Sequence, residues 1–253
     1  MKDVKFEFNG NEINDLAFFK SLSGMSVEYV FDQVTKQNRN GIVKLVNHLR
    51  MLNNFTIYSN ERLDSDFNSI ITKTEELNEK YYPVYTTKDG DCLYNAISRI
   101  LFSHEQYNYL IRLGTLFIIF EYGEYFLNLI KRTFGSVNIK GDVVDENIKY
   151  KEIIYKVSTF HEWACEYTQV AISILLNKPI YCYTIDINQS RPYSYVYYAN
   201  EDQLKNTPLI IAFLINHYVP LLARGQKSII KTKPQSELCR IKLEKIIFYD
   251  CKS

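Results

Sequence analysis

The sequence predicts an α+β fold, an α/β sandwich in which helices flank one central sheet. Apolar residues recur at helical spacing through most of the first 176 residues. Three runs rich in Ile, Tyr and Val follow at 180–185, 194–198 and 209–214, and they read as strands. Helices that precede strands in this order are typical of a sheet covered by helices.

Composition excludes several classes of protein. Hydrophobic residues make up 46% and charged residues 23% of the 253 residues, as in ordinary globular domains. A net charge of +1 gives no field that would attract nucleic acid or an acidic membrane, so we expect neither as a partner. The five cysteines contain no CxxC pair, which argues against a disulfide framework or a structural zinc site.

The chain shows no targeting or membrane segment. Its first ten residues lack the apolar core of a signal peptide, and the apolar run 116–130 is interrupted by Glu121, Glu124 and Asn128. We therefore expect a monomer in a reducing, cytoplasmic compartment. That compartment could also be a host cell into which the protein is delivered.

Residues 1–80 are expected to form a helical N-terminal extension that takes part in substrate recognition. Val30, Val34 and the residues from 42 to 49 recur at helical spacing, and Asn40-Gly41 predicts a break between two helices. Residues 82–85 predict an extended segment, because the residue before a proline disfavours helix.

Residues 81–225 are expected to form the main domain. A turn at 88–91 precedes a helix from Cys92 to Phe102. Ser103 and Gln106 resemble a capping box, which predicts a second helix reaching about Ile130, and 135–141 reads as a loop. Another helix is expected from Trp163 to Leu176, ended by Asn-Lys-Pro at 177–179. The basic segment 226–253 is expected to pack on this domain or to extend it.

Cys92 is the best candidate nucleophile. A glycine-containing turn followed by a helix start lets several N–H groups converge on the sulfur. The same amides could hold an oxyanion, where one donor is typically worth about 3 kcal/mol. A cysteine at a helix start can equally be a small buried hydrophobe.

His217 is the best candidate base among the four histidines. It directly follows the apolar strand 209–215, so the sheet would present it at an edge or an end, where its position can be fixed closely. His104 is at a predicted helix start, and neither His48 nor His161 has a comparable placement. A histidine at a strand end can also be purely structural.

The segment Asp89-Gly90-Asp91-Cys92-Leu93-Tyr94-Asn95-Ala96-Ile97 resembles the D-G-x-C-L-[FY]-x-[AS]-[ILV] motif around the nucleophile of ovarian tumour (OTU) deubiquitinases. Four further segments match that family in order. They are Tyr109-Leu110-Ile111-Arg112, the helix motif at Trp163-Ala164-Cys165-Glu166 with Val170-Ala171, the strand 179–183, and His217-Tyr218. The resemblance covers about residues 82–224.

The resemblance implies a cysteine protease that needs no metal or other cofactor and acts on ubiquitin, polyubiquitin chains or a ubiquitin-like modifier. It places Cys92, His217 and Asp89 in the catalytic site, with Cys92 as nucleophile and His217 as base. It implies an oxyanion loop of Asp89, Gly90, Asp91 and Cys92. Trp163 and Glu166 are expected beneath the site as structural support.

One position departs from the family pattern. Many members carry Asp or Asn two residues after the histidine, and here Val219 stands there. The third residue could come from elsewhere, with Glu75, Glu76 and Glu79 as candidates; the pair could work as a dyad; or activity could be lost. The last case would make the chain a ubiquitin-binding scaffold.

Overall fold

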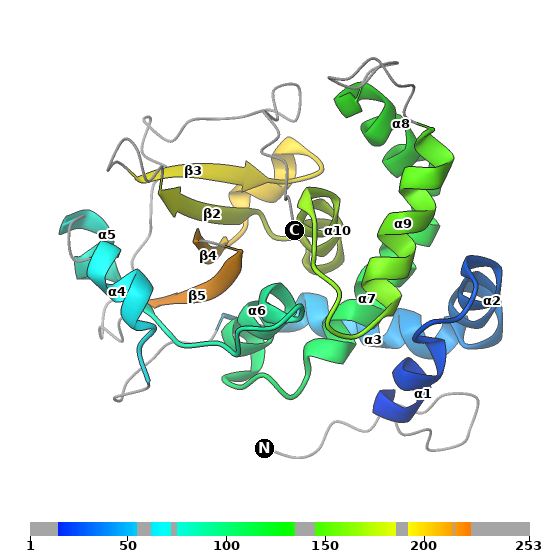
Figure 1. The fold of residues 1–253 in the computed structure, drawn as a ribbon, viewed down its shortest axis with the longest axis horizontal. Coiled ribbons are helices and arrows are strands. Elements are labelled where there is room, and N and C mark those ends of the chain that lie inside the picture. The colour runs from blue at the N-terminus through cyan, green and yellow to red at the C-terminus, as the bar shows by residue number, and fades with distance from the viewer. Residues whose placement is uncertain are drawn as a thin grey trace.

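The computed structural model describes residues 15–54, 62–71, 75–134, 145–185, 192–214 and 216–223. Within these ranges one mixed sheet lies between a small helical layer, α4 and α5, and a larger helical layer on its other side (Figure 1). The predicted α+β class is confirmed. The loop expected at 135–141 and the segment 226–253 lie outside the described residues.

The sheet contains β1 (Tyr81–Pro83), β2 (Ile180–Ile185), β3 (Pro192–Tyr197), β4 (Leu209–Leu214) and β5 (His217–Ala223). Its order is β1-β5-β4-β2-β3. β2 and β4 run parallel, whereas the β1–β5, β4–β5 and β2–β3 pairs are antiparallel. The β4–β5 hairpin pairs Leu214 with His217, so His217 lies at the end of the sheet where β4 finishes.

The larger layer contains the helix that begins at Cys92 and, packed against most of its other helices, the helix that begins at Asn108. Its helices are α1 (Asp15–Leu22), α2 (Val27–Asp32), α3 (Arg39–Met51), α6 (Cys92–Phe102), α7 (Asn108–Glu121), α8 (Gly123–Phe134), α9 (Glu146–Ser158) and α10 (Glu166–Leu176). A π-helical turn, η1 (Gln33–Gln37), joins α2 to α3, and a 3-10 helix, η2 (Glu201–Lys205), precedes β4. α6 is buried along almost its whole length between β5 and α7.

The N-terminal helices belong to the same core as the main domain. Phe19 of α1 and Leu45 of α3 are fully buried in the cluster that also holds Leu93 and Ile111. The boundary expected at residue 80 therefore does not separate two cores. Burying apolar surface stabilises a fold by about 25 cal/mol per Å². These helices therefore contribute to the stability of the domain that holds the site.

The second layer consists of α4 (Ser65–Ile71) and α5 (Glu75–Lys80). Phe67 and Ile71 of α4 pack with Val219 and Leu221 of β5 in a separate buried cluster. Tyr218 of β5 instead belongs to the larger core, as expected from the alternation of side chains along a strand. The odd-numbered face of β5, which begins with His217, is thus the one that α4 covers.

Three predicted boundaries were wrong for local reasons. Asn40 and Gly41 lie inside α3, because the break falls earlier, at η1. Ser103 does not start a helix; its φ of 69° makes it the left-handed end of α6. The helix expected from Trp163 begins at Glu166, and it ends as predicted at Asn177, with a φ of 51°.

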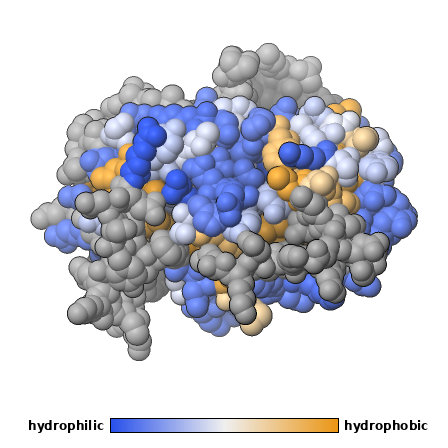
Figure 2. Space-filling model, turned by 90° about the horizontal axis from the view of Figure 1, so that it is seen from below, coloured by the Kyte–Doolittle hydropathy of each residue, from blue (hydrophilic) through white to orange (hydrophobic). Residues whose placement is uncertain are grey.

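Hydrophilic residues predominate on the face shown in Figure 2, with hydrophobic ones in small patches between them. In the described ranges, no single helix is long and apolar enough to cross a membrane. The pair α7–α8 would reach that length only across a bend of 85°.

Candidate active site

Cys92 is the first residue of α6, and its sulfur lies where several backbone N–H groups meet. The backbone N–H groups of Tyr218 and Leu93 act on the sulfur to lower its pKa, which favours the thiolate. Burial outweighs them: the residue is only 1% exposed. Burial, reinforced by the charge of Asp89, raises the pKa of the Cys92 thiol to about 11. The resting thiol is therefore protonated at neutral pH.

The loop before Cys92 is closed by its own hydrogen bonds. The Asp91 N–H donates to Asp89 Oδ1 at 2.9 Å, and the Cys92 N–H donates to the Asp89 carbonyl at 3.2 Å. The Asp89 N–H is bonded to the Thr87 carbonyl at 3.1 Å. Three of the amides expected to hold an oxyanion thus already have acceptors. The Gly90 N–H has none in the described part of the chain.

Asp89 organises this loop through its side chain. Besides the Asp91 N–H, its Oδ1 accepts from Asn95 Nδ2 at 3.3 Å. Burial raises the pKa of Asp89, and the charge of Asp91 acts in the same direction, while the bond from the Asp91 N–H opposes them. The carboxylate therefore acts on Cys92 through the shape of the loop and through its charge.

Arg112 of α7 anchors the other side of the loop. Its guanidinium is fully buried and bonds Asp91 Oδ1 through both Nε, at 2.7 Å, and Nη2. It also donates to the carbonyl of Glu162 at 2.9 Å, in the segment after α9. That segment lies against Gly90 so closely that a Cβ there would be 1.7 Å from the His161 carbonyl oxygen. Only glycine fits at this position.

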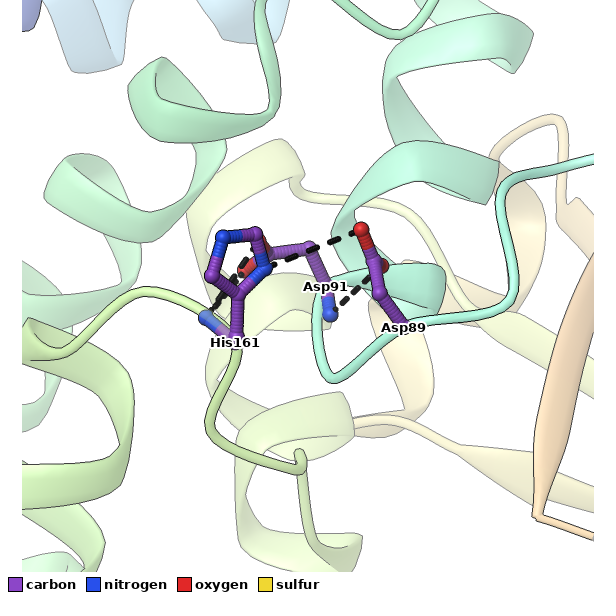
Figure 3. Close-up of side chains that lie close together, drawn as sticks. All are labelled: Asp89, Asp91 and His161. Carbon is purple, nitrogen blue, oxygen red and sulfur yellow. Dashed lines mark hydrogen bonds and ion pairs between the residues drawn. The ribbon is translucent and has the colours of Figure 1, made fainter.

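Asp89, Asp91 and His161 form the cluster drawn in Figure 3, with the imidazole pointing toward both carboxylates. His161 Nδ1 lies 2.9 Å from Asp91 Oδ2 and 3.7 Å from Asp89 Oδ2. Their ligand atoms are all within 4.8 Å of one another, a spacing that could suit a metal ion. Arg112 already neutralises Asp91, however, so we interpret the cluster as a brace between two loops.

His217 is held by acceptors on one side of its ring. Nε2 is 3.3 Å from Thr86 Oγ1, whose own hydrogen is donated to the Tyr218 carbonyl at 2.6 Å. The threonine oxygen can therefore only accept from Nε2, which assigns the ring proton to Nε2. Nδ1 is buried and has no hydrogen-bond partner among the described residues. Nδ1 is therefore the unprotonated nitrogen, and the next residue in the chain, Tyr218, has its backbone N–H at the Cys92 sulfur.

Asp64 is the acidic partner of this histidine. Its Oδ2 lies 3.6 Å from His217 Nε2. Its Oδ1 accepts from the N–H groups of Asp66 and Phe67 at 3.1 and 3.0 Å, so Asp64 caps the N-terminus of α4. Burial acts to raise the pKa of Asp64, but the bonds from His217 and Phe67 and the charge of Lys88 outweigh it and lower that pKa. The carboxylate is ionised at neutral pH.

Asp64 takes the place left open by Val219. Val219 is fully buried among apolar side chains of α4 and cannot orient an imidazole. Asn216 is exposed in the β4–β5 turn, with a φ of 61°. Of the acids expected from the sequence, Glu79 is exposed on α5, and the side chains of Glu75 and Glu76 lie outside the described residues. The residues around Asp64 are compatible with a helix N-cap, so that role could be predicted from the sequence. The pairing of Asp64 with His217, 153 residues later in the chain, could not.

The two residues expected beneath the site differ in placement. Trp163 is 46% exposed, because it precedes α10 in a loop instead of lying on the buried side of that helix, so this expectation was wrong. Glu166 is the first residue of α10 and half-buried, and burial raises the pKa of its carboxyl. The residues that support the loop are Arg112 and His161, which the sequence did not identify in this role.

The chain resembles known proteins in its sequence and its fold. A family model described as OTU-like cysteine protease matches residues 87–219. No curated protein matches the sequence. The solved OTU domain of OTUD1 is 18% identical, with a TM-score of 0.47, over 62% of this chain and 99% of that one.

Two microbial structures are similar at lower scores. The viral OTU domain protease from Dera Ghazi Khan virus is 16% identical, with a TM-score of 0.41, over 71% of this chain and 99% of that one. An OTU deubiquitinase from Wolbachia pipientis wMel, solved bound to ubiquitin, is 14% identical, with a TM-score of 0.39, over 57% and 96% of the two chains.

Proposed function

Because the chain belongs to the OTU-like cysteine protease family, we propose that it is a deubiquitinase. It hydrolyses the isopeptide or peptide bond after the C-terminal glycine of ubiquitin or a ubiquitin-like modifier. The observation that carries this proposal is the geometry around His217. Its Nε2 faces two acceptors, its buried Nδ1 has no partner among the described residues, and the following residue, Tyr218, reaches the Cys92 sulfur through its backbone N–H.

The reaction follows from these positions. His217 Nδ1 takes the proton of the Cys92 thiol as the sulfur attacks the carbonyl carbon of the scissile bond. The imidazolium then protonates the leaving lysine amine, and the modifier remains on Cys92 as a thioester. Water, deprotonated by the same nitrogen, hydrolyses the thioester and restores the thiol.

Asp64 and Thr86 act as positioning residues. Both accept at His217 Nε2, so both hold the ring proton on that nitrogen and leave Nδ1 free. The negative charge of Asp64 also stabilises the imidazolium that forms when the thiol is deprotonated. A Cys-His-Asp arrangement therefore replaces the dyad that Val219 suggested.

We infer that this site rests in a closed state. The sulfur is buried, its pKa is raised to about 11, and three loop amides are bonded within the chain. We propose that the tail of the modifier opens the loop and exposes the sulfur. The Gly90 N–H is then the first oxyanion donor, because it needs no bond broken.

The N-terminal helices contribute to substrate recognition in this proposal. A hollow of about 430 Å³ beside the nucleophile loop is lined by Leu16 and Lys20 of α1 together with Asp89 and Asn95. Truncation would remove part of the core, so Lys20→Glu is the better test. An unchanged KM for every di-ubiquitin would exclude a role for this side chain.

Hydrolysis of ubiquitin with a fluorogenic amide at its C-terminus tests the proposed activity. The wild-type chain should turn it over, and Cys92→Ala and His217→Ala should each reduce kcat to background without unfolding the protein. A panel of di-ubiquitins then gives the linkage preference. Tight ubiquitin binding without turnover by the wild type would instead support the scaffold.

A further inference from the structure

A second cavity lies at the end of the sheet opposite His217. It has a volume of about 510 Å³ and is enclosed by the ends of α3 and α10, the residues before β2 and β4, and the end of β5. Its polar lining includes Arg50, Lys178, Asn53, Asn206 and Thr207. This volume is in the range of about 300–1,000 Å³ that small-molecule sites occupy.

Two of the lining residues are cations that, among the described residues, hydrogen-bond only to neutral groups. The Lys178 Nζ donates to the Leu52 carbonyl at 2.7 Å and to Asn54 Oδ1 at 2.9 Å. The residue is only 9% exposed, and burial lowers the pKa of its ammonium group. Arg50 donates from Nε to the Leu175 carbonyl at 3.0 Å, with a weaker contact from Nη2.

Capping of helix ends accounts for part of this arrangement. Leu52 and Leu175 lie at the C-terminal ends of α3 and α10, where carbonyls lack helical partners and the helix dipole favours a cation. Capping uses two of the three ammonium hydrogens of Lys178 and leaves Nη1 of Arg50 without a partner among the described residues.

No lining residue compensates the charge of Arg50 and Lys178. The lining in the described part of the chain contains Arg50, Lys80 and Lys178 and no Asp or Glu. Lys178 is largely removed from water, where a cation is costly unless an anion accompanies it, whereas Arg50 is exposed. An anion in this cavity could accept hydrogen bonds from the third hydrogen of Lys178 Nζ, from Arg50 Nη1 and from the hydroxyl of Thr207, which also lines the cavity.

We propose that this cavity binds a small phosphate-bearing ligand through Arg50 and Lys178. Phosphate oxygens suit the flat fork of a guanidinium and the point charge of an ammonium, and they accept several donors at once. Ile100 of α6 and Leu222 of β5 also line the cavity, so the ligand would contact both elements that carry the catalytic pair. Binding itself does not depend on the proposed protease activity.

Isothermal titration of the full chain with sodium pyrophosphate, at ionic strength held constant with sodium chloride, tests the site. One pyrophosphate should bind per chain, with citrate at least tenfold weaker. Lys178→Met should raise the Kd for pyrophosphate at least tenfold. The matched control Lys205→Gln, which removes an exposed lysine paired with Asp202, should leave the Kd within twofold.

Thr207→Glu is a second variant that tests the same site if Lys178→Met does not fold. Thr207 is exposed and lines the cavity, so the new carboxylate supplies the counter-charge without disturbing the core. It should also raise the Kd for pyrophosphate at least tenfold. Absence of binding to the wild type, an unchanged Kd in Thr207→Glu, or equal affinity for citrate would each overturn the proposal.

Discussion

Replacing Asp64 with asparagine separates the two roles of this side chain. The amide oxygen of the Asp64→Asn variant can still cap α4 at the position of Oδ1, where Asp66 and Phe67 donate. The amide NH2 then replaces Oδ2, 3.6 Å from His217 Nε2. The new amide is a donor that faces the Nε2–H, so His217 loses its charged acceptor, while Thr86 Oγ1 can still accept from Nε2. The imidazolium that forms when the thiol is deprotonated then loses the negative charge that stabilises it.

The size of the effect follows from the interaction that is lost. The contact of 3.6 Å is an ion pair, and we take about 1.5–3 kcal/mol, the range for interactions with a charged group, as the stabilisation of the imidazolium that is lost. At 1.36 kcal/mol per decade, this predicts a fall in kcat of about 10- to 150-fold. The free energy of unfolding should change by less than about 1 kcal/mol, because the helix cap is kept.

Hydrolysis of the fluorogenic ubiquitin amide gives kcat and KM, and urea unfolding gives the stability. Asp66→Asn is the matched control, because Asp66 is 58% exposed, pairs with Lys88 and lies only two residues away. Its kcat should stay within twofold of the wild type. Full activity in a folded Asp64→Asn variant would show that Asp64 does not orient His217.

Three further outcomes are expected. Arg112→Met should cost about 3–5 kcal/mol in urea unfolding, because it leaves the buried Asp91 carboxylate without its cation; a loss below 1 kcal/mol would contradict the brace. Gly90→Ala should lower kcat/KM at least tenfold, since its Cβ would meet the His161 carbonyl oxygen at 1.7 Å; retained activity in a folded variant would show that the loop is free to move. Iodoacetamide should alkylate Cys92 slowly at pH 7, as followed by peptide mass spectrometry, and faster as pH rises toward its pKa of about 11. Compared with a thiol of pKa 8.5, Cys92 has a smaller fraction of thiolate, but its thiolate is more nucleophilic. Together these two effects predict an alkylation rate about 20-fold lower, and burial of the sulfur lowers it further. Fast alkylation at pH 6 would instead indicate a preformed thiolate.

Local patterns were enough to predict the nucleophile helix and most of the sheet. The turn before Cys92 and the apolar spacing after it predicted α6, and the runs at 180–185 and 209–214 predicted β2 and β4 with their observed bounds. The placement of His217 at a strand end also followed from the preceding apolar run. Each of these features depends on residues close together in the sequence.

Features that depend on long-range packing could not be predicted in this way. Asp64 meets His217 only because α4 covers the odd-numbered face of β5. The buried pair of Arg112 and Asp91 likewise needs α7 to lie against the nucleophile loop. The family motif indicated that a third residue was missing, but only the fold identifies which side chain reaches the imidazole.

The central claim is that the Cys92 sulfur attacks a carbonyl with the help of His217. Incubation with ubiquitin that carries an electrophile in place of its C-terminal glycine tests it most directly. The account predicts one covalent adduct per chain, mapped to Cys92, absent in Cys92→Ala and strongly slowed in His217→Ala. An adduct on a different cysteine, or none with a folded wild-type chain, would contradict it.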